Sequence, residues 1–231
     1  MQAIILAAGT GRRLGGTVPK PLLKINGKPI LVRLIEQLKR RGVDDVVVVT
    51  GYQKHMLEGA IAHLNVNTVF NPFYPISDNL ASFWIGQRHI HDSCILAHGD
   101  IILEDELLPK LIETGGDVVL PMDTSSLDQE SMKMRVVDGE LVNLSKAIAL
   151  SEATGESLPL MKFSREAIHE LKELTDAMLA SKEFRHFIDD AILKLIRENK
   201  FMARILDVTG YKWVEIDVRS DLERARQLFS A

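Results

Sequence analysis

A glycine-rich segment near the start of the chain has the residue types that could hold phosphates. Residues 7–22 read AAGTGRRLGGTVPKPL and directly follow an apolar run, QAIIL. Gly9 and Gly11 let the backbone approach an anion, and consecutive N–H groups in such a turn form an anion-binding concavity. Arg13 and Lys20 add positive charge where a triphosphate would fold back. We therefore favour a phosphate-binding loop over a turn that needs glycines only for its dihedral angles.

Two common nucleotide-binding patterns do not fit this segment. The dinucleotide pattern G-x-G-x-x-G fails because Leu14 stands where its last glycine is required. The Walker pattern fails because Thr17 stands in place of the required lysine. The loop must therefore bind phosphates in another way, if it binds them.

Two aspartates that are far apart in the sequence have a chemistry that would complete such a site. Asp100 follows a buried apolar run and a glycine, and Asp217 lies in the segment WVEIDV, two positions after Glu215. An attacking phosphate and a nucleoside triphosphate repel each other, so a cation must lie between them. Mg²⁺ typically takes one or two carboxylates and completes its shell with water and substrate phosphates. Taken alone, either aspartate could equally serve a turn or a cap. The histidines, including His98, show no spacing typical of a metal site.

The elements that would position these residues alternate between strands and helices. Apolar periodicity predicts strands at 4–7, 44–50, 67–70, 93–98 and 117–121, and helices at 30–41, 53–64, 80–90 and 104–115. The second half begins with a hairpin around Asp138-Gly139 and continues with helices at 164–180 and 187–199, strands at 202–208 and 213–218, and a last helix at 220–230. The pattern predicts a single α/β domain over residues 1–231, with three layers and a mostly parallel sheet. Ligands should gather at the carboxyl ends of its strands.

Composition and charge exclude several classes of protein. The 231 residues are 46% hydrophobic and carry a formal net charge of -4, which argues against a general nucleic-acid binder. No apolar run approaches the roughly 18 residues that a membrane helix needs. The single cysteine, Cys94, is expected to be a buried thiol in a reducing compartment. We therefore expect a cytoplasmic protein with no membrane or nucleic-acid partner.

The glycine loop and several later segments resemble one group of enzymes. The pattern A-A-G-x-G-x-R-L followed by P-K-P-L is typical of nucleotidyltransferases that activate small phosphates, a superfamily that includes the sugar-nucleotide pyrophosphorylases. Along nearly its whole length the chain is similar to the bacterial phosphocholine cytidylyltransferases within that superfamily. The loop matches at Ala7, Ala8, Gly9, Gly11, Arg13, Leu14, Pro19, Lys20, Pro21 and Leu22, and later matches include SDNLASFW (77–84), GDIIL (99–103), MKMRVVDGELVNLSK (132–146) and WVEIDVRSDLERA (213–225).

The resemblance implies a Rossmann-like, GT-A-like nucleotidyltransferase fold and a Mg²⁺-dependent transfer of CMP from CTP to a small, phosphocholine-like acceptor. Pyrophosphate would leave, and Asp100 and Asp217 would hold the magnesium ion. Lys20 and Arg13 are the candidate catalytic residues because they would face the triphosphate. The candidate nucleotide-binding residues are Ala7, Ala8, Gly9, Gly11, Arg13, Lys20, Tyr52, Asn79 and Ser82.

The acceptor pocket is assigned less directly. Lys133 could bind the acceptor phosphate, and Asp78, Glu156 and Asp190 could face a positively charged head group. Trp213 could supply an aromatic surface for that group. The chain departs from the group at Pro159, where related enzymes often have glycine. That change in the backbone puts phosphocholine itself in doubt.

Several alternatives remain open on the sequence alone. The acceptor could be 2-aminoethylphosphonate or inositol 1-phosphate, and spacing does not separate CTP from UTP. A sugar-1-phosphate nucleotidyltransferase is the rival enzyme, and an inactive nucleotide-binding regulatory module is the rival outside enzymes. Retention of Arg13, Lys20, Asp100 and Asp217 together argues against the inactive module. A homodimer is allowed but not required.

Overall fold

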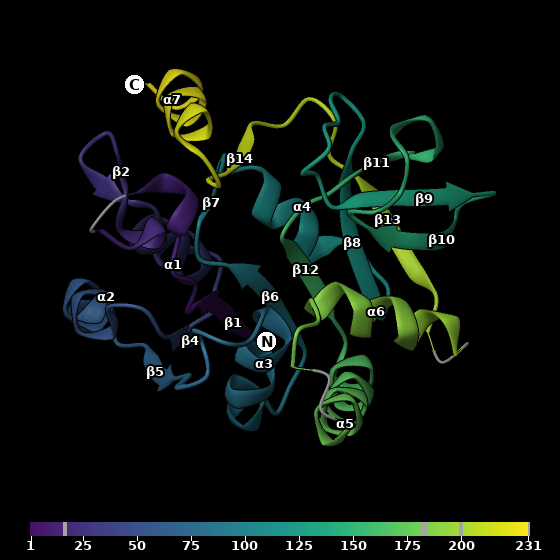
Figure 1. Cartoon of the computed structure of the whole chain (residues 1–231), viewed down its shortest axis with the longest axis horizontal. Coiled ribbons are helices and arrows are strands. Elements are labelled where there is room, and N and C mark those ends of the chain that lie inside the picture. The colour runs from purple at the N-terminus through teal and green to yellow at the C-terminus, as the bar shows by residue number, and fades with distance from the viewer. Residues whose placement is uncertain (16–17, 182–183, 199–200, 231) are drawn as a thin grey trace.

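A mixed ten-stranded sheet forms the centre of the computed structural model, which describes residues 1–15, 18–181, 184–198 and 201–230 (Figure 1). Its core is parallel. Strand β1 (Gln2–Ala7) pairs with β4 (Asp45–Thr50) on one side and β6 (Cys94–His98) on the other, and β4 pairs with β5 (Asn67–Phe70). These four strands lie where the sequence predicts them. The apolar runs of β1, β4 and β6 are buried on both faces, whereas β5 is a largely exposed strand at the edge of the sheet.

The second half of the chain adds antiparallel strands, so the sheet is less uniformly parallel than the sequence suggests. The order is β10 (Glu140–Ser145), β9 (Lys133–Val137), β11 (Gly155–Ser157), β8 (Val118–Asp123), β12 (Leu160–Phe163) and then β6, with β13 (Ala203–Asp207) pairing in parallel with β8. The sequence gives no strand signal for β12, since Lys162 interrupts its apolar run. Lys162 is nevertheless buried, and its ammonium group donates to the carbonyl oxygens of Ile112 and Thr114.

Helices cover both faces of the sheet and give the three layers that the sequence predicts. Ala3 and Ile5 of β1 pack with α1 (Ile30–Arg40), α2 (Lys54–Ile61) and α4 (Leu107–Glu113). The alternate residues Ile4 and Leu6 pack with α3 (Asn79–Gly86), α5 (Arg165–Ala180) and α6 (Ile188–Arg197). This alternation is the period of two expected for a strand buried on both sides. None of the helices described in the structure is long and apolar enough to cross a membrane.

A small second sheet brings the end of the chain back to the end of β6. Strand β7 (Ile101–Leu103) pairs antiparallel with β14 (Trp213–Glu215), and α7 (Arg219–Leu228) follows. The helix packs through Ala225 against Ile102, Val214 and Ile216. The Ile216 N–H also donates to the Asp100 carbonyl oxygen at 3.0 Å. This pairing places Asp217 beside Asp100, although more than a hundred residues separate them.

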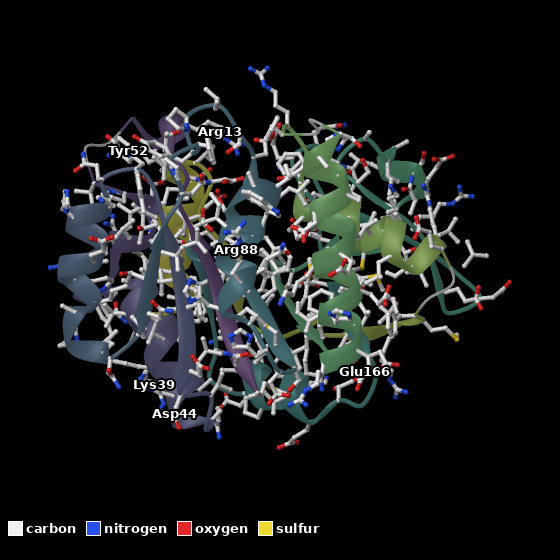
Figure 2. The ribbon with its side chains drawn as sticks, turned by 90° about the horizontal axis from the view of Figure 1, so that it is seen from below. Arg13, Lys39, Asp44, Tyr52, Arg88 and Glu166 are labelled. Atoms are coloured by element: carbon white, nitrogen blue, oxygen red, sulfur yellow. The ribbon has the colours of Figure 1, made fainter. Side chains whose placement is uncertain are left out.

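The loops that follow the parallel strands lie at one end of the molecule. Figure 2 shows Arg13 and Tyr52, which follow β1 and β4, at the same end, with Lys39 and Asp44 at the opposite end. The first pair therefore marks the carboxyl ends of the strands, where ligands bind in open α/β sheets.

Candidate active site

The glycine loop is shaped by two close backbone approaches. Gly11 has φ +59°, and a Cβ there would lie 2.8 Å from Lys20 Cγ, so glycine lets the lysine stem cross the loop. Gly51, which follows β4, lies so close to Ala8 that a Cβ would fall 2.5 Å from the Ala8 carbonyl oxygen. That oxygen accepts a hydrogen bond from the Tyr52 N–H at 3.0 Å. The loops after β1 and β4 are thus joined directly.

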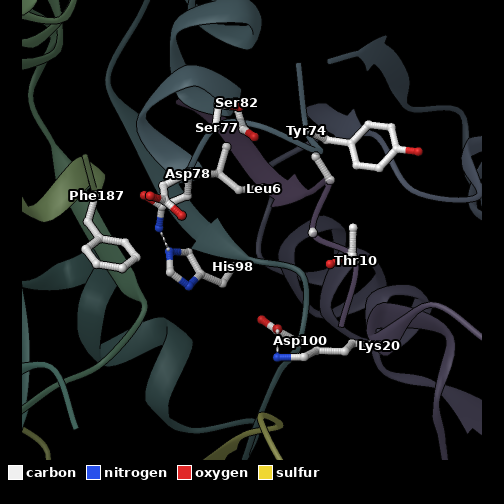
Figure 3. Close-up of a pocket in the computed structure, with 13 residues that line it drawn as sticks. Leu6, Thr10, Lys20, Tyr74, Ser77, Asp78, Ser82, His98, Asp100 and Phe187 are labelled. Carbon is white, nitrogen blue, oxygen red and sulfur yellow. Dashed lines mark hydrogen bonds and ion pairs between the residues drawn. The ribbon is translucent and has the colours of Figure 1, made fainter. Parts of the chain in front are cut away.

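The cationic loop and the two distant aspartates meet at one point. Lys20 Nζ lies 2.5 Å from Asp217 Oδ1 and 3.5 Å from Asp100 Oδ2. Arg13 Nη2 lies 3.0 Å from the second oxygen of Asp217, and Arg13 Nη1 lies 3.0 Å from Glu130 Oε2. Figure 3 shows Lys20 extended toward Asp100 along the wall of a pocket. The two carboxylates therefore contact the same ammonium group and lie close together, and their predicted role as magnesium ligands stays a prediction.

The charges at this point fix the protonation of its members. Burial lowers the pKa of Lys20, but the neighbouring Asp100 and Asp217 outweigh it and hold the pKa above its ordinary value. Burial raises the pKa of Asp217, but its bond to Lys20 and the charge of Arg13 bring the net pKa below its ordinary value. Burial and the Glu215 carboxylate raise the pKa of Asp100 to about 6. Lys20 is therefore a stable cation and Asp217 a stable anion, whereas Asp100 titrates closer to neutrality.

A hydrogen-bonded chain runs past Asp100 through His98. His98 Nδ1 lies 3.0 Å from Glu215 Oε1, and His98 Nε2 lies 3.1 Å from Asn79 Nδ2. Because Asn79 Oδ1 already accepts from the Ile188 N–H at 2.8 Å, the amide nitrogen faces the imidazole. His98, Asp100 and Glu215 each offer a ligand atom within 4.8 Å of the others. The spacing of His98 in the sequence does not indicate a metal site, because only the fold brings these three residues together.

Three cavities border the meeting point of the charges. The glycine-loop cavity measures about 290 Å³, and its lining includes Ala8, Gly9, Lys20, Asn79, Ser82 and Asp100 (Figure 3). The middle cavity measures about 130 Å³, and its lining includes Arg13, Lys146, Ser157, Asp189, Glu215 and Asp217. The acidic cavity measures about 320 Å³, and its lining includes Asp128, Glu130, Glu156, Trp213, Asp221 and Arg224. The middle cavity shares Asn79, His98 and Phe187 with the first and Glu215 and Asp217 with the third.

Most of the predicted nucleotide-binding residues lie at the glycine-loop cavity. Ala8, Gly9, Lys20, Asn79 and Ser82 line it directly. The other four do not line this cavity. Ala7 is buried in β1, and Gly11 leaves room for Lys20. The Tyr52 N–H donates to Ala8, and Arg13 lines the middle cavity. The Ser82 hydroxyl already accepts from Asn71 Nδ2 at 3.0 Å, so it also holds the loop that carries Asn71.

The predicted acceptor residues are more scattered. Glu156 and Trp213 line the acidic cavity, where the Trp213 indole N–H donates to Asp123 at 2.8 Å. Asp78 lines the glycine-loop cavity. Lys133 is fully buried and donates to the carbonyl oxygens of Gln129 and Ser131, so it is not the surface lysine that its sequence context allows.

Asp190 has a local role at the start of α6. Its Oδ2 accepts the Phe187 N–H at 3.0 Å and lies 3.1 Å from His186 Nδ1, and it lines none of the three cavities. Its neighbour Asp189 is buried and lines the middle cavity instead. Only the rotational phase of the helix, which the sequence does not fix, decides which of the two adjacent aspartates faces the cavity.

Three polar residues of the middle cavity were not predicted from the sequence. They are Lys146, Ser157 and Asp189. Lys146 directly follows the hairpin strand β10, and its charge lowers the pKa of Asp217 along with Lys20 and Arg13. Lys146 ends the matched segment at 132–146, and Ser157 and Asp189 fall in two further segments that match the resembled group, GES at 155–157 and DDAI at 189–192. The segments were noticed while the individual side chains were not.

The fold and this site are those expected of a nucleotidyltransferase: a glycine loop follows the first strand, and a lysine and two aspartates meet beside it. The chain belongs to the MobA-like NTP transferase domain family, whose model matches residues 3–191. The resemblance to nucleotidyltransferases found in the sequence is therefore confirmed.

Individual relatives agree with this assignment. The chain is 27% identical over 251 residues to CTP:phosphoglutamine cytidylyltransferase of Campylobacter jejuni, covering 96% of this chain and 98% of that protein. It is 27% identical over 235 residues to a bifunctional IPC transferase and DIPP synthase of Archaeoglobus fulgidus, but spans only 44% of that protein. A solved structure of the Streptococcus pneumoniae CTP:phosphocholine cytidylyltransferase LicC superimposes with a TM-score of 0.80 at 19% identity, covering 99% of both chains. This last likeness confirms the predicted α/β fold.

Proposed function

We propose that the chain is a divalent-metal-dependent cytidylyltransferase. It transfers CMP from CTP to a small phosphorylated acceptor and releases pyrophosphate, with residues 1–231 acting as one domain. The observation that carries the proposal is the contact of Lys20 with both Asp100 and Asp217 at the wall of the glycine-loop cavity. The choice of CTP rests on the names of the relatives, two of which act on CTP and a small phosphorylated compound.

The glycine loop would hold the nucleotide. Nothing lies within 4 Å of a Cβ built on Gly9, so its backbone is open to an incoming phosphate. Lys20 stabilises the charge that develops on the α-phosphate, and Arg13 holds the departing pyrophosphate. Cytosine lies near Ala8, with hydrogen bonds from the residues around Asn79.

The carboxylates fit a magnesium ion. Asp100 and Asp217 offer hard oxygen ligands, which Mg²⁺ prefers, and it commonly needs no more than two from the protein. The second set, His98 with Asp100 and Glu215, includes a nitrogen ligand and suits a transition metal better. We assign magnesium to the two aspartates. When bound, the ion neutralises phosphate charge and so lets two anions approach.

The acceptor enters through the middle cavity. That cavity shares three lining residues with the glycine-loop cavity, whereas the acidic cavity shares none with it. Arg13 and Lys146 supply positive charge for the acceptor phosphate. An oxygen of that phosphate attacks the α-phosphorus in line and pyrophosphate leaves, so catalysis comes from positioning and charge stabilisation.

A pyrophosphate-release screen tests the proposal. It crosses the four nucleoside triphosphates with phosphocholine, phosphoethanolamine, 2-aminoethylphosphonate, inositol 1-phosphate and glucose 1-phosphate, each with Mg²⁺ and with EDTA. We expect release that requires CTP, an acceptor and the metal together. Release only with UTP or dTTP and the hexose phosphate would replace the proposal by a sugar-1-phosphate nucleotidyltransferase. CTP binding without any turnover would support the regulatory module.

The homodimer stays a prediction. Sedimentation velocity of the full chain at several concentrations would test it.

A further inference from the structure

The loop between β8 and β9 is held in shape by its own polar side chains. Asp128 Oδ1 accepts the N–H groups of Glu130 and Ser131, each at 2.8 Å. Lys133 is fully buried at the start of β9, and its ammonium group donates to the carbonyl oxygens of Gln129 and Ser131, both at 3.1 Å. A buried ammonium group is costly unless its hydrogen bonds are satisfied, so the loop backbone is fixed around this lysine.

This loop presents Glu130 to the cationic glycine loop. Glu130 Oε2 lies 3.0 Å from Arg13 Nη1, while Arg13 Nη2 lies 3.0 Å from Asp217 Oδ2. Two carboxylates from distant parts of the chain therefore hold one guanidinium group. The side chains of Arg13 and Glu130 are 48% and 70% exposed, so their ion pair adds little to the stability of the fold. Its consequence is for the direction in which the arginine points.

The two carboxylates leave part of the guanidinium group available to a phosphate. Arginine offers five N–H donors in a planar fork, and the contacts with Glu130 and Asp217 use only two of them. Arg13 lines the middle cavity, whereas Glu130 lines the acidic cavity on the other side of Asp217, which lines both. Glu130 thus holds the guanidinium group from the side of the acidic cavity.

We propose that Glu130 is a positioning residue, which holds Arg13 in the orientation that binds the pyrophosphate part of the nucleotide. The inference rests on the proposed function, because that function gives Arg13 its phosphate. The opposite role would be competition, in which Glu130 keeps Arg13 away from the phosphate. A competing carboxylate has to withdraw when the nucleotide binds, whereas the bonds of Asp128 and Lys133 fix the loop that carries Glu130.

Calorimetric titration tests the inference without any turnover. The wild type, Glu130→Ala and Glu130→Gln are titrated with CTP, pyrophosphate and CMP, each in the presence of Mg²⁺. Glu130→Ala should raise the Kd for CTP and for pyrophosphate about three- to fivefold, which is the upper range for an exposed ion pair. Glu130→Gln keeps an oxygen that can accept from Arg13, so its increase should be about twofold. The Kd for CMP, which lacks the pyrophosphate part, should not change in either variant.

Two further variants separate positioning from a general effect of charge. Asp128→Ala loosens the loop but leaves Glu130 in place, so it should raise the Kd for CTP by the same factor as Glu130→Ala. The double variant should show no larger increase, because both changes act through one contact. Glu223→Gln is the matched control: it removes a charge from an exposed ion pair with Arg219 and lines none of the three cavities. Its Kd for CTP should equal that of the wild type.

Three results would overturn the inference: an unchanged Kd for CTP in Glu130→Ala, tighter binding in that variant, or an equal loss of affinity for CMP. Tighter binding would show that Glu130 competes for Arg13. If no acceptor releases pyrophosphate but the wild type binds CTP, the proposed function fails, and the same ratios of Kd still decide the role of Glu130. A wild type that binds neither CTP nor pyrophosphate would overturn both.

Discussion

The proposed nucleotide side of this site, at the glycine-loop cavity, and its proposed acceptor side, at the middle cavity, are built in different ways. On the nucleotide side, Gly9, Gly11 and Lys20 belong to one continuous segment after β1, and they stay together in the fold. On the acceptor side, Lys146, Ser157 and Asp189 come from the end of β10, from β11 and from α6. A local motif is thus enough to bring the proposed phosphate ligands together, whereas the middle cavity depends on how separate elements pack.

This difference suggests a reason why the acceptor specificity can vary between nucleotidyltransferases while the transfer reaction stays the same. A triphosphate presents the same charges in every nucleotidyltransferase, so a loop of fixed spacing can hold it. The acceptor differs between relatives, as the names phosphoglutamine and phosphocholine show. Short strands and helix starts can exchange a side chain at the cavity wall without disturbing the phosphate loop.

The largest expected effect is the loss of turnover on the nucleotide side. Lys20→Ala or Asp217→Asn should each lower kcat on the order of 10²-fold or more, because the first removes positive charge beside the α-phosphate and the second removes a proposed ligand of magnesium. The pyrophosphate-release assay measures the rate, and circular dichroism checks that the fold is kept. Lys28→Ala is the matched control, since Lys28 is exposed, forms an ion pair with Glu36 and lines none of the three cavities.

Glu215→Gln sharpens the assignment of the metal. It should lower kcat less than Asp217→Asn if magnesium is held by the two aspartates. The reverse order would favour the set formed by His98, Asp100 and Glu215.

The next effect contrasts the two lysines of the acceptor side. Lys146→Ala should raise the KM for the acceptor by about 10- to 30-fold and leave Tm unchanged, because it removes a charge from the cavity wall. Lys133→Ala should instead lower stability by about 2–4 kcal/mol, because two carbonyl oxygens lose a buried partner and a void remains. Thermal unfolding and acceptor kinetics of both variants separate the two roles. A rise in acceptor KM for Lys133→Ala without a loss of stability would restore its predicted role.

What the sequence predicts follows from the range of the interactions. Continuous apolar runs predicted β1, β4 and β6, because that signal is local. The glycine loop could likewise be found from one continuous segment, and its phosphate-binding role stays a prediction. The antiparallel strand β12 was missed because Lys162 breaks its pattern and finds its carbonyl partners only in the folded chain. The three-residue strand β11, which carries Ser157, is too short to show a period.

The range of the interactions also explains why the positions of some charged residues could be predicted and those of others could not. The resemblance implied that Asp100 and Asp217 lie together, and the need for a cation between two phosphates supported it. No such demand distinguishes Asp189 from Asp190, or Lys133 from Lys146. These pairs differ only in burial and direction, which tertiary packing sets.

A smaller effect concerns the charge of Asp189. Burial raises the pKa of its carboxyl to about 6, so between about pH 4 and pH 6 the folded protein binds a proton that the unfolded chain has released. Stability contributed by the neutral form is therefore present at low pH and lost as pH rises through 6. Asp189→Asn cannot ionise, so it should be more stable than the wild type by about 1–2 kcal/mol at pH 8 and nearly equal to it at pH 4. Thermal unfolding at both pH values measures the difference, and a gain that does not change with pH would contradict the ionisation argument.

The smallest effect belongs to the neighbouring Asp190. Because its carboxylate accepts the Phe187 N–H at the start of α6, Asp190→Ala should lower stability by about 1 kcal/mol, a normal loss for a helix cap. The KM for the acceptor should stay within twofold of the wild type, since the side chain lines none of the three cavities. An increase of tenfold or more in that KM, with Tm preserved, would show that Asp190 turns toward the acceptor after all. The difference between the two sides of the site would then be smaller, because the sequence would have predicted one acceptor ligand correctly.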